Sequence, residues 1–225
     1  MESTPLLIDA TSLQLGQSAA PRTKGLHAST VYNDLYADLE PKRYRHEEGS
    51  TPPPLLLEQG MIVETALEDG LKRRLEGERG GEIIQRPGEF THHYDFEGHQ
   101  GDMYFTPDLF IYNGVGLRVG EVKSTSMLST VGDDTIAAAQ RGDPDAIESL
   151  RLIPLLPKFD KFMHQMQFYC CCLTTPHARL YTFFMRGNNR PPFPQLLAWD
   201  LFFTEDELAT TYSIHMNHAA YRRML

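Results

Sequence analysis

The sequence predicts an α/β fold of the α+β kind, with one central mixed β-sheet flanked by helices. Three observations support this prediction. Segments of helical periodicity lie on both sides of a strand-rich stretch in the middle of the 225 residues, further strands and a helix follow, and no segment repeats. Elements in this order bury a core by packing helices against a sheet. Residues 1–25 are rich in Ser, Thr, Pro, Gly and Ala and predict a flexible arm, so residues 26–225 are expected to form one domain.

Two helices are expected ahead of the strands. The first begins at Ser29 or Thr30, either of which can cap it, and continues to residue 39. The second covers residues 55–77, where leucine and valine recur at helical spacing. It ends in the basic run Lys72 to Arg74, which suits the negative end of the helix dipole. Basic runs of this kind are usually solvated surface.

Four strands are expected next, separated by turn-forming residues such as Pro87-Gly88. They cover residues 82–86, 90–97, 102–112 and 115–123.

The second half of the chain predicts a helical insertion over residues 124–158. Its clearest part is GDPDAIESLRLI, where Asp143 can cap a helix and Pro144 takes the first helical position. Another helix, two strands and a final helix follow. The final helix has Thr204 as its cap and Glu207 as the capping-box partner. The helix before it and the two strands cover residues 159–173, 178–185 and 196–203.

Composition limits the function classes. No apolar run has the length of a membrane span, and the N-terminal residues lack a basic region followed by an apolar block, so neither a membrane protein nor a secretory leader is expected. The three adjacent cysteines, Cys170 to Cys172, offer no disulfide framework and are expected to be small buried residues. A reducing compartment, the cytoplasm, is favoured. The formal net charge of −9 counts against non-specific adhesion to nucleic acid.

A hairpin in the middle of the chain carries the candidate chemistry. Asn113-Gly114 strongly favours a tight turn between two strands. A two-residue loop would put Asp108 opposite Val119, whereas a four-residue loop, NGVG, would put it opposite Glu121. In both registers Asp108, Glu121 and Lys123 share one face of the hairpin, because side chains alternate along a strand.

These residue types suit phosphodiester hydrolysis. Carboxylates bind hard divalent cations, which neutralise developing charge and acidify a bound water. A lysine beside that water can orient it and stabilise the transition state. The spacing alone is also compatible with an exposed, charged hairpin, because so short a pattern occurs often by chance.

Two further pairs belong to the same set. Gly60 and Glu64 are four residues apart on the second expected helix, so they share one helical face. Gln165 and Tyr169 have the same spacing on the later helix.

The chain resembles the PD-(D/E)XK nuclease superfamily, specifically its RecB-like and phage-type exonuclease branch, over residues 27–218. The resemblance rests on the order of four elements: the Gly60/Glu64 pair, the PD motif (Pro107-Asp108), the EVK motif (Glu121 to Lys123) and the Gln165/Tyr169 pair. The resemblance implies a restriction-endonuclease-like core. It also implies a metal-dependent deoxyribonuclease, an exonuclease that hydrolyses DNA in recombination, repair or viral DNA processing, in the cytoplasm of the cell or of a phage's host.

The resemblance also implies roles for single residues. Asp108 and Glu121 would bind Mg²⁺ or Mn²⁺ through their side chains, Val122 would add its carbonyl, and Lys123 would serve the attacking water. Glu64 takes the place where many members have histidine and would be a further metal ligand. The sequence alone is equally compatible with a surface glutamate on an amphipathic helix.

Gln165 and Tyr169 would contact the nucleic acid or brace the site. Some relatives hold an iron–sulfur cluster with one early and three late cysteines. This chain has no cysteine before Cys170, and three consecutive ones cannot present three thiolates from a helix, so no cluster is expected.

Several alternatives stay open. The fold could serve as a structural or interaction component of a virion or replication complex, as the acidic charge and the proline-rich loops at residues 52–54 and 191–194 suggest. RNA could replace DNA, and a protein partner could order the N-terminal arm. Asp102 is a possible extra ligand. His92 and His93 point to opposite faces of a strand, so a zinc site is not expected there.

Overall fold

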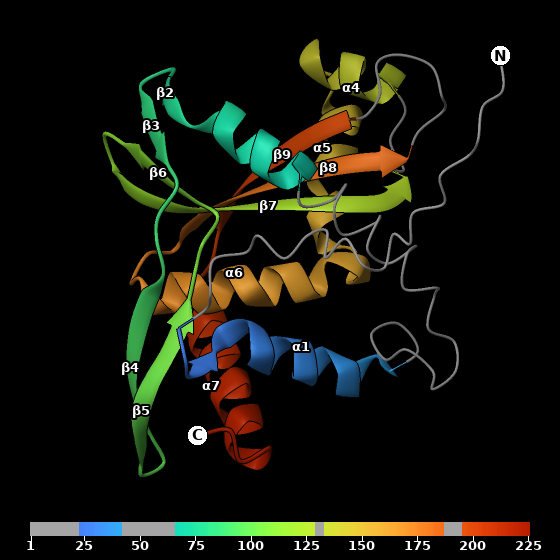
Figure 1. The fold of residues 1–225 in the computed structure, drawn as a ribbon. Coiled ribbons are helices and arrows are strands. Elements are labelled where there is room, and N and C mark those ends of the chain that lie inside the picture. The colour runs from blue at the N-terminus through green and yellow to red at the C-terminus, as the bar shows by residue number, and fades with distance from the viewer. Residues whose placement is uncertain (1–22, 42–65, 129–132, 187–194) are drawn as a thin grey trace, which may run out of the picture.

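The computed structural model describes residues 23–41, 66–128, 133–186 and 195–225 of the chain (Figure 1). Its centre is a six-stranded mixed sheet with the strand order β2-β3-β6-β7-β8-β9. These strands are β2 (Gly77–Arg79), β3 (Glu82–Gln85), β6 (Leu109–Asn113), β7 (Gly116–Leu128), β8 (His177–Arg186) and β9 (Gln195–Phe202). The predicted central mixed sheet is therefore confirmed.

The parallel pair β7–β8 makes the sheet mixed, because the other neighbouring strands are antiparallel. Parallel strands need a long crossover connection. Here the crossover contains α4 (Asp133–Gln140), α5 (Pro144–Arg151) and α6 (Asp160–Cys172). The helical insertion that the sequence predicts is thus the connection that brings β8 beside β7, although β7 itself continues to Leu128.

A second, three-stranded sheet was not expected. It has the order β1-β5-β4 and consists of β1 (Leu26–His27), β5 (His99–Phe105) and β4 (Phe90–Phe96). The prediction of one strand over residues 102–112 is wrong, because the chain leaves β5 at Phe105 and enters β6 of the other sheet at Leu109. Pro107 lies in this break, where its fixed φ and missing N–H end the first ladder. Asp108 consequently lies at the junction of the two sheets.

Helices cover both faces of the central sheet (Figure 1). On one face α1 (Ala28–Leu39), α6 and α7 (Glu205–Tyr221) enclose the main core. On the other face, the helix at residues 66–75 packs Leu71 and Leu75 against Ile84, Leu109 and Val122. Alternation along β7 explains this arrangement, since Val119 belongs to the first core and Val122 to the second.

The structure confirms the predicted caps of two helices and corrects the cap of a third. Asp143 accepts hydrogen bonds from two backbone N–H groups of α5, and Thr204 forms a capping box with Glu207 on α7, as predicted. The predicted caps of the first helix, Ser29 and Thr30, are wrong. His27 is the N-cap residue because its extended backbone pairs with β5 immediately before the helix begins.

Some predictions fall outside the described residues. They concern most of the N-terminal arm, both proline-rich loops and the first half of the helix predicted at residues 55–77. Within the described part of the chain, no helix is both long and apolar enough to cross a membrane. Cys170 is fully buried, and its burial raises the pKa of its thiol to about 12, whereas Cys171 and Cys172 are half-buried.

A buried histidine pair joins α6 to α7. Nε2 of His164 lies 3.2 Å from Nδ1 of His215, and the His215 ring stacks on Phe168 with 3.9 Å between centroids. Burial, followed by the nearby His218, lowers the pKa of His164 to about 4. Burial also lowers the pKa of His215 well below its usual range. Both rings are therefore neutral at pH 7, and protonating either one opposes folding.

Acid should destabilise the fold through this pair. Because their folded-state pKa values lie below the unfolded value of 6.5, the stabilising contributions are present above pH 6.5 and are lost as the pH falls toward the folded-state values. For His164, the change from 6.5 to about 4 corresponds to on the order of 3 kcal/mol. We expect urea titrations to show a smaller acid-induced loss of unfolding free energy in His164→Gln than in the wild type.

The matched control is His99→Gln, because His99 is exposed. It should lose as much stability in acid as the wild type does. An equal loss in the His164 variant would contradict the prediction.

Candidate metal-binding site

The register of the β6–β7 hairpin decides how the candidate carboxylates lie. Leu109 pairs with Gly120, so the next position outward sets Asp108 against Glu121. This is the register of the predicted four-residue loop, and the alternative that put Asp108 opposite Val119 is wrong.

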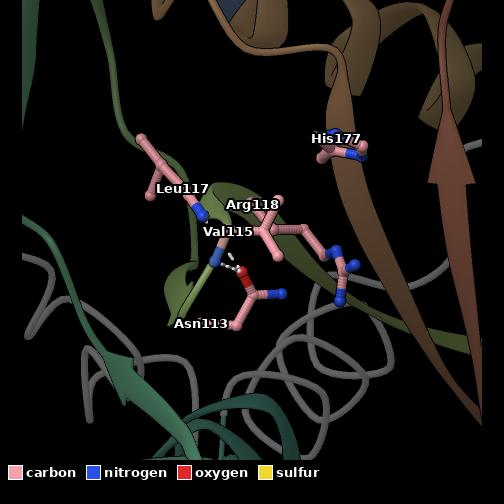
Figure 2. Close-up of a pocket in the computed structure, with 6 residues that line it drawn as sticks. Asn113, Val115, Leu117, Arg118 and His177 are labelled. Carbon is pink, nitrogen blue, oxygen red and sulfur yellow. Dashed lines mark hydrogen bonds between the residues drawn. The ribbon is translucent and has the colours of Figure 1, made fainter.

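The turn itself explains the choice of register. The Asn113 side-chain oxygen accepts hydrogen bonds from the backbone N–H groups of Val115, at 3.0 Å, and Gly116, at 3.1 Å (Figure 2). Asn113 also pairs with Gly116 across the hairpin. The side chain thus tightens the predicted loop from within, and the tight turn is centred on Gly114 and Val115.

Asp108 is held by two contacts. Its Oδ2 accepts a hydrogen bond of 2.8 Å from the backbone N–H of Val122, and its Oδ1 lies 2.6 Å from Nζ of Lys72. The N–H and C=O of one strand residue point to the same side of the strand. The Val122 carbonyl is therefore directed to the side of β7 on which Asp108 lies.

Glu121 is the most buried carboxylate in the site, with 1% of the residue exposed. Its Oε1 accepts hydrogen bonds from Lys123 Nζ and Gln165 Nε2. Its Oε2 is buried and has no hydrogen-bond partner among the described residues. Burial, followed by the negative charge of Asp108, raises the pKa of Glu121 to about 7.

Lys123 shares the face of β7 that carries Glu121. Burial acts to lower the pKa of this lysine, but the Glu121 and Asp108 carboxylates act to raise it, and the net direction is upward. The ammonium therefore keeps its proton at neutral pH. The Phe162 ring lies 5.7 Å from this nitrogen.

Gln165 and Tyr169 face the same site from α6. The Gln165 amide donates to Glu121 and lies 3.2 Å from the Tyr169 hydroxyl. Tyr32 of α1 lies close to the Tyr169 side chain. Burial, followed by the nearby Tyr32 and Glu121, raises the pKa of Tyr169 well above its usual range, so this hydroxyl keeps its proton.

These groups line an open cavity of about 210 Å³. Its walls come from the central hairpin, α6, α1 and the small sheet. The lining includes Asp108, Glu121, Lys123, Gln165 and Tyr169, together with His27, Ser29, Tyr32, Glu89 and Tyr104.

The donor set fits a hard divalent cation such as Mg²⁺ or Mn²⁺. Two carboxylates and a backbone carbonyl offer only oxygen ligands, which such ions prefer. The unpartnered Oε2 of Glu121 is the strongest indication, since a buried carboxylate oxygen is costly unless a donor or a cation satisfies it. Glu64, the further predicted ligand, lies outside the described residues.

Several residues of the site escaped the sequence analysis, and Lys72 and Tyr32 are two of them. Lys72 was interpreted as part of a solvated basic run, and Tyr32 was given no role within the first expected helix. One indication for Lys72 was present in the sequence. It lies in the last turn of the predicted helix that precedes the Asp108 hairpin in the sequence. Its partner, Asp108, depends on the tertiary fold.

The other candidate ligands lie elsewhere. Asp102 is on β5, where its carboxylate lies 2.5 Å from the His93 ring, and His92 turns instead toward Tyr212. The expectation that the two histidines do not converge is confirmed.

Among the residues that the structure describes, one carboxylate–histidine group, on α1 and α7, has the spacing of metal ligands: Asp34, Asp38 and His218. Arg222 pairs with both of these aspartates, so an ion network already neutralises them. A smaller cavity of about 110 Å³ lies at the hairpin tip, between Val115 and His177 (Figure 2).

Solved structures resemble this chain in fold. The crystal structure of SSO0001 aligns with a TM-score of 0.50 and 13% identity, over 94% of this chain and 83% of that chain. An alkaline exonuclease, LHK-Exo from Laribacter hongkongensis, aligns with a TM-score of 0.47 and 15% identity, over 94% and 90%. Its complex with dAMP aligns with a TM-score of 0.46 and 15% identity, over 88% of each chain. No family model and no curated protein matches the sequence.

Gly120 is expected to be essential to the hairpin's close packing. A Cβ at this position would lie 2.8 Å from Cβ of Leu109 and 3.3 Å from Cδ1 of Ile111. We expect Gly120→Ala to lower the free energy of unfolding by about 1–3 kcal/mol, the usual cost of overpacking. Chemical denaturation measures this change.

Gly70→Ala is the matched control. Gly70 lies in the helix at residues 66–75 with open space around it. Alanine there should leave the stability unchanged or raise it by up to about 1 kcal/mol. If both variants behaved alike, the proposed packing at Gly120 would be wrong.

Proposed function

We propose that this chain is a metal-dependent nuclease that hydrolyses phosphodiester bonds in DNA. The observation that carries the proposal is the buried, unpartnered Oε2 of Glu121, in a cavity that also contains Asp108 and the cationic Lys123. The two carboxylates can serve as ligands for a hard cation, and the Lys123 ammonium supplies a positive charge beside them. The central sheet with helices on both faces is consistent with a restriction-endonuclease-like core.

Asp108, Glu121 and the Val122 carbonyl would hold Mg²⁺ or Mn²⁺. When bound, such an ion neutralises charge on the scissile phosphate and acidifies a water. Lys123 would orient the attacking water and stabilise negative charge as it develops, because its ammonium stays protonated. Gln165 would fix the orientation of Glu121 through its hydrogen bond to Oε1.

The finer assignments are part of the same proposal. The order of the motifs supports an exonuclease of the RecB-like and phage-type branch, acting in recombination, repair or viral DNA processing in the cytoplasm. The N-terminal arm would be available to a protein partner. Glu64 would supply a third carboxylate, as the resemblance implies.

Removing one ligand or the lysine should strongly reduce the rate of hydrolysis. We expect Asp108→Asn and Lys123→Met each to lower the rate on linear DNA, with Mg²⁺ or Mn²⁺ present, by about 10²-fold or more, the usual effect of losing one stabilising group. Gel assays with linear and circular DNA measure the rates and separate exonuclease from endonuclease activity. A chelator should stop the wild-type reaction.

Asp102→Asn is the control, since Asp102 pairs with His93 on the other sheet. It should keep wild-type activity. Hydrolysis that survives in both site variants would remove this site from the reaction. Stoichiometric binding of a partner without metal-dependent hydrolysis would favour the structural role instead.

A further inference from the structure

Lys72 reaches the candidate metal site from the opposite face of the central sheet. Its helix is anchored by Leu71 and Leu75, which pack on the core formed by β3, β6, β7 and β8. From this helix the Lys72 ammonium lies 2.6 Å from Oδ1 of Asp108, and only 22% of its side chain is exposed. The contact is possible because β6 begins at Leu109. The β6–β7 ladder therefore ends at the Leu109–Gly120 pair, and β7 has no β6 partner beyond it.

The contact uses the carboxylate oxygen that a cation would need. Oδ2 of Asp108 already accepts the Val122 N–H, so Oδ1 is the oxygen better placed to bind an ion. A divalent cation on Oδ1 would lie within a few ångströms of the Lys72 ammonium. Like charges at such a distance repel strongly in a partly buried site.

Each of the two candidate ligand carboxylates already has an ammonium partner. Two carboxylates, Asp108 and Glu121, face two ammonium groups, those of Lys72 and Lys123. A divalent cation adds two positive charges, which favour either the departure of an ammonium or the arrival of an anion. Lys72 is the group better able to move, because its long stem comes from the last turn of a helix, whereas Lys123 lies within the central strand β7.

We propose, on the basis of the proposed function, that Lys72 is a positioning residue that competes with the divalent cation at Asp108 and pairs with a substrate phosphate once displaced. The negative charge of the phosphate then replaces that of Asp108 as the partner of the displaced Lys72 ammonium. Metal and nucleic acid consequently bind with positive cooperativity, and each raises the affinity for the other by the same factor.

A purely structural role for Lys72 makes a different prediction. If the ion pair only ties the helix to the sheet, removing it loosens Asp108 and weakens metal binding. If Lys72 competes with the cation, removing it strengthens metal binding. The sign of the change in Mn²⁺ affinity therefore separates the two roles without measuring catalysis.

The experiment is calorimetric titration of Mn²⁺ into the full chain and its variants. Without nucleic acid, we expect Lys72→Met to bind Mn²⁺ about 10-fold more tightly than the wild type, within the usual range of coupling between sites. Arg73→Met is the matched control and should bind like the wild type, because Arg73 pairs with Asp69 and 68% of its side chain is exposed.

A second titration adds a hydrolysis-resistant phosphorothioate oligonucleotide. It should raise the Mn²⁺ affinity of the wild type by about fivefold or more, and that gain should shrink markedly in Lys72→Met. Circular dichroism checks the fold of each variant. Lys72→Gln, which keeps a polar side chain, replaces Lys72→Met in both titrations if the latter does not fold.

The outcomes separate this inference from the proposed function. If the wild type binds Mn²⁺ through Asp108 and the Lys72 variants bind it no more tightly, only the competition is overturned. An unchanged oligonucleotide effect in those variants also overturns it. If neither the wild type nor the Lys72 variants bind Mn²⁺ in a way that Asp108→Asn abolishes, the proposed function and this inference both fail.

Discussion

The antiparallel pairing of β6 with β7 is the constraint on which the candidate site depends. It sets Leu109 against Gly120, and so places Asp108 against Glu121. A slip of one residue would turn one of these carboxylates to the opposite face of the sheet. The absence of a Cβ at Gly120 allows the two strands to approach closely beside the site. The Asn113 side chain fixes the turn at the other end of the hairpin.

The site lies where the two sheets and both helical layers meet. Asp108 follows the break at Pro107, so it belongs to neither β5 nor β6 and can be reached from both faces of the central sheet. Gln165 approaches Glu121 from one face, and Lys72 approaches Asp108 from the other. Burying two carboxylates together is costly unless cations balance them, and here two lysines do so. Oε2 of Glu121 still has no hydrogen-bond partner among the described residues, and a bound metal ion would satisfy this oxygen instead.

The sequence predicted the features that depend on local chemistry. Helix caps at Asp143 and Thr204, the tight hairpin turn and the spacing of Gln165 and Tyr169 follow from neighbours within a few residues, and the structure has them all. The predicted face shared by Glu121 and Lys123 also follows from simple alternation along a strand.

Long-range features could not be predicted in the same way. Both hairpin registers put the carboxylates on one face, so the alternation of side chains could not distinguish the two registers. The hydrogen bonds of the Asn113 side chain favour the register that the structure has. The assignment of β5 to a separate sheet depends on pairing with β1, far away along the chain. The contact of Lys72 with Asp108 joins residues on opposite sides of a sheet, and no periodicity encodes it.

The most direct test of the central claim is an anomalous difference map from crystals of the full chain grown with Mn²⁺. The account predicts a peak roughly 2.2 Å from a carboxylate oxygen of Asp108 and from Oε2 of Glu121, with the Lys72 ammonium moved away from Oδ1. A peak at Asp34 and His218 instead, or a map in which these two carboxylates bind no ion while Mn²⁺ is saturating, would contradict it.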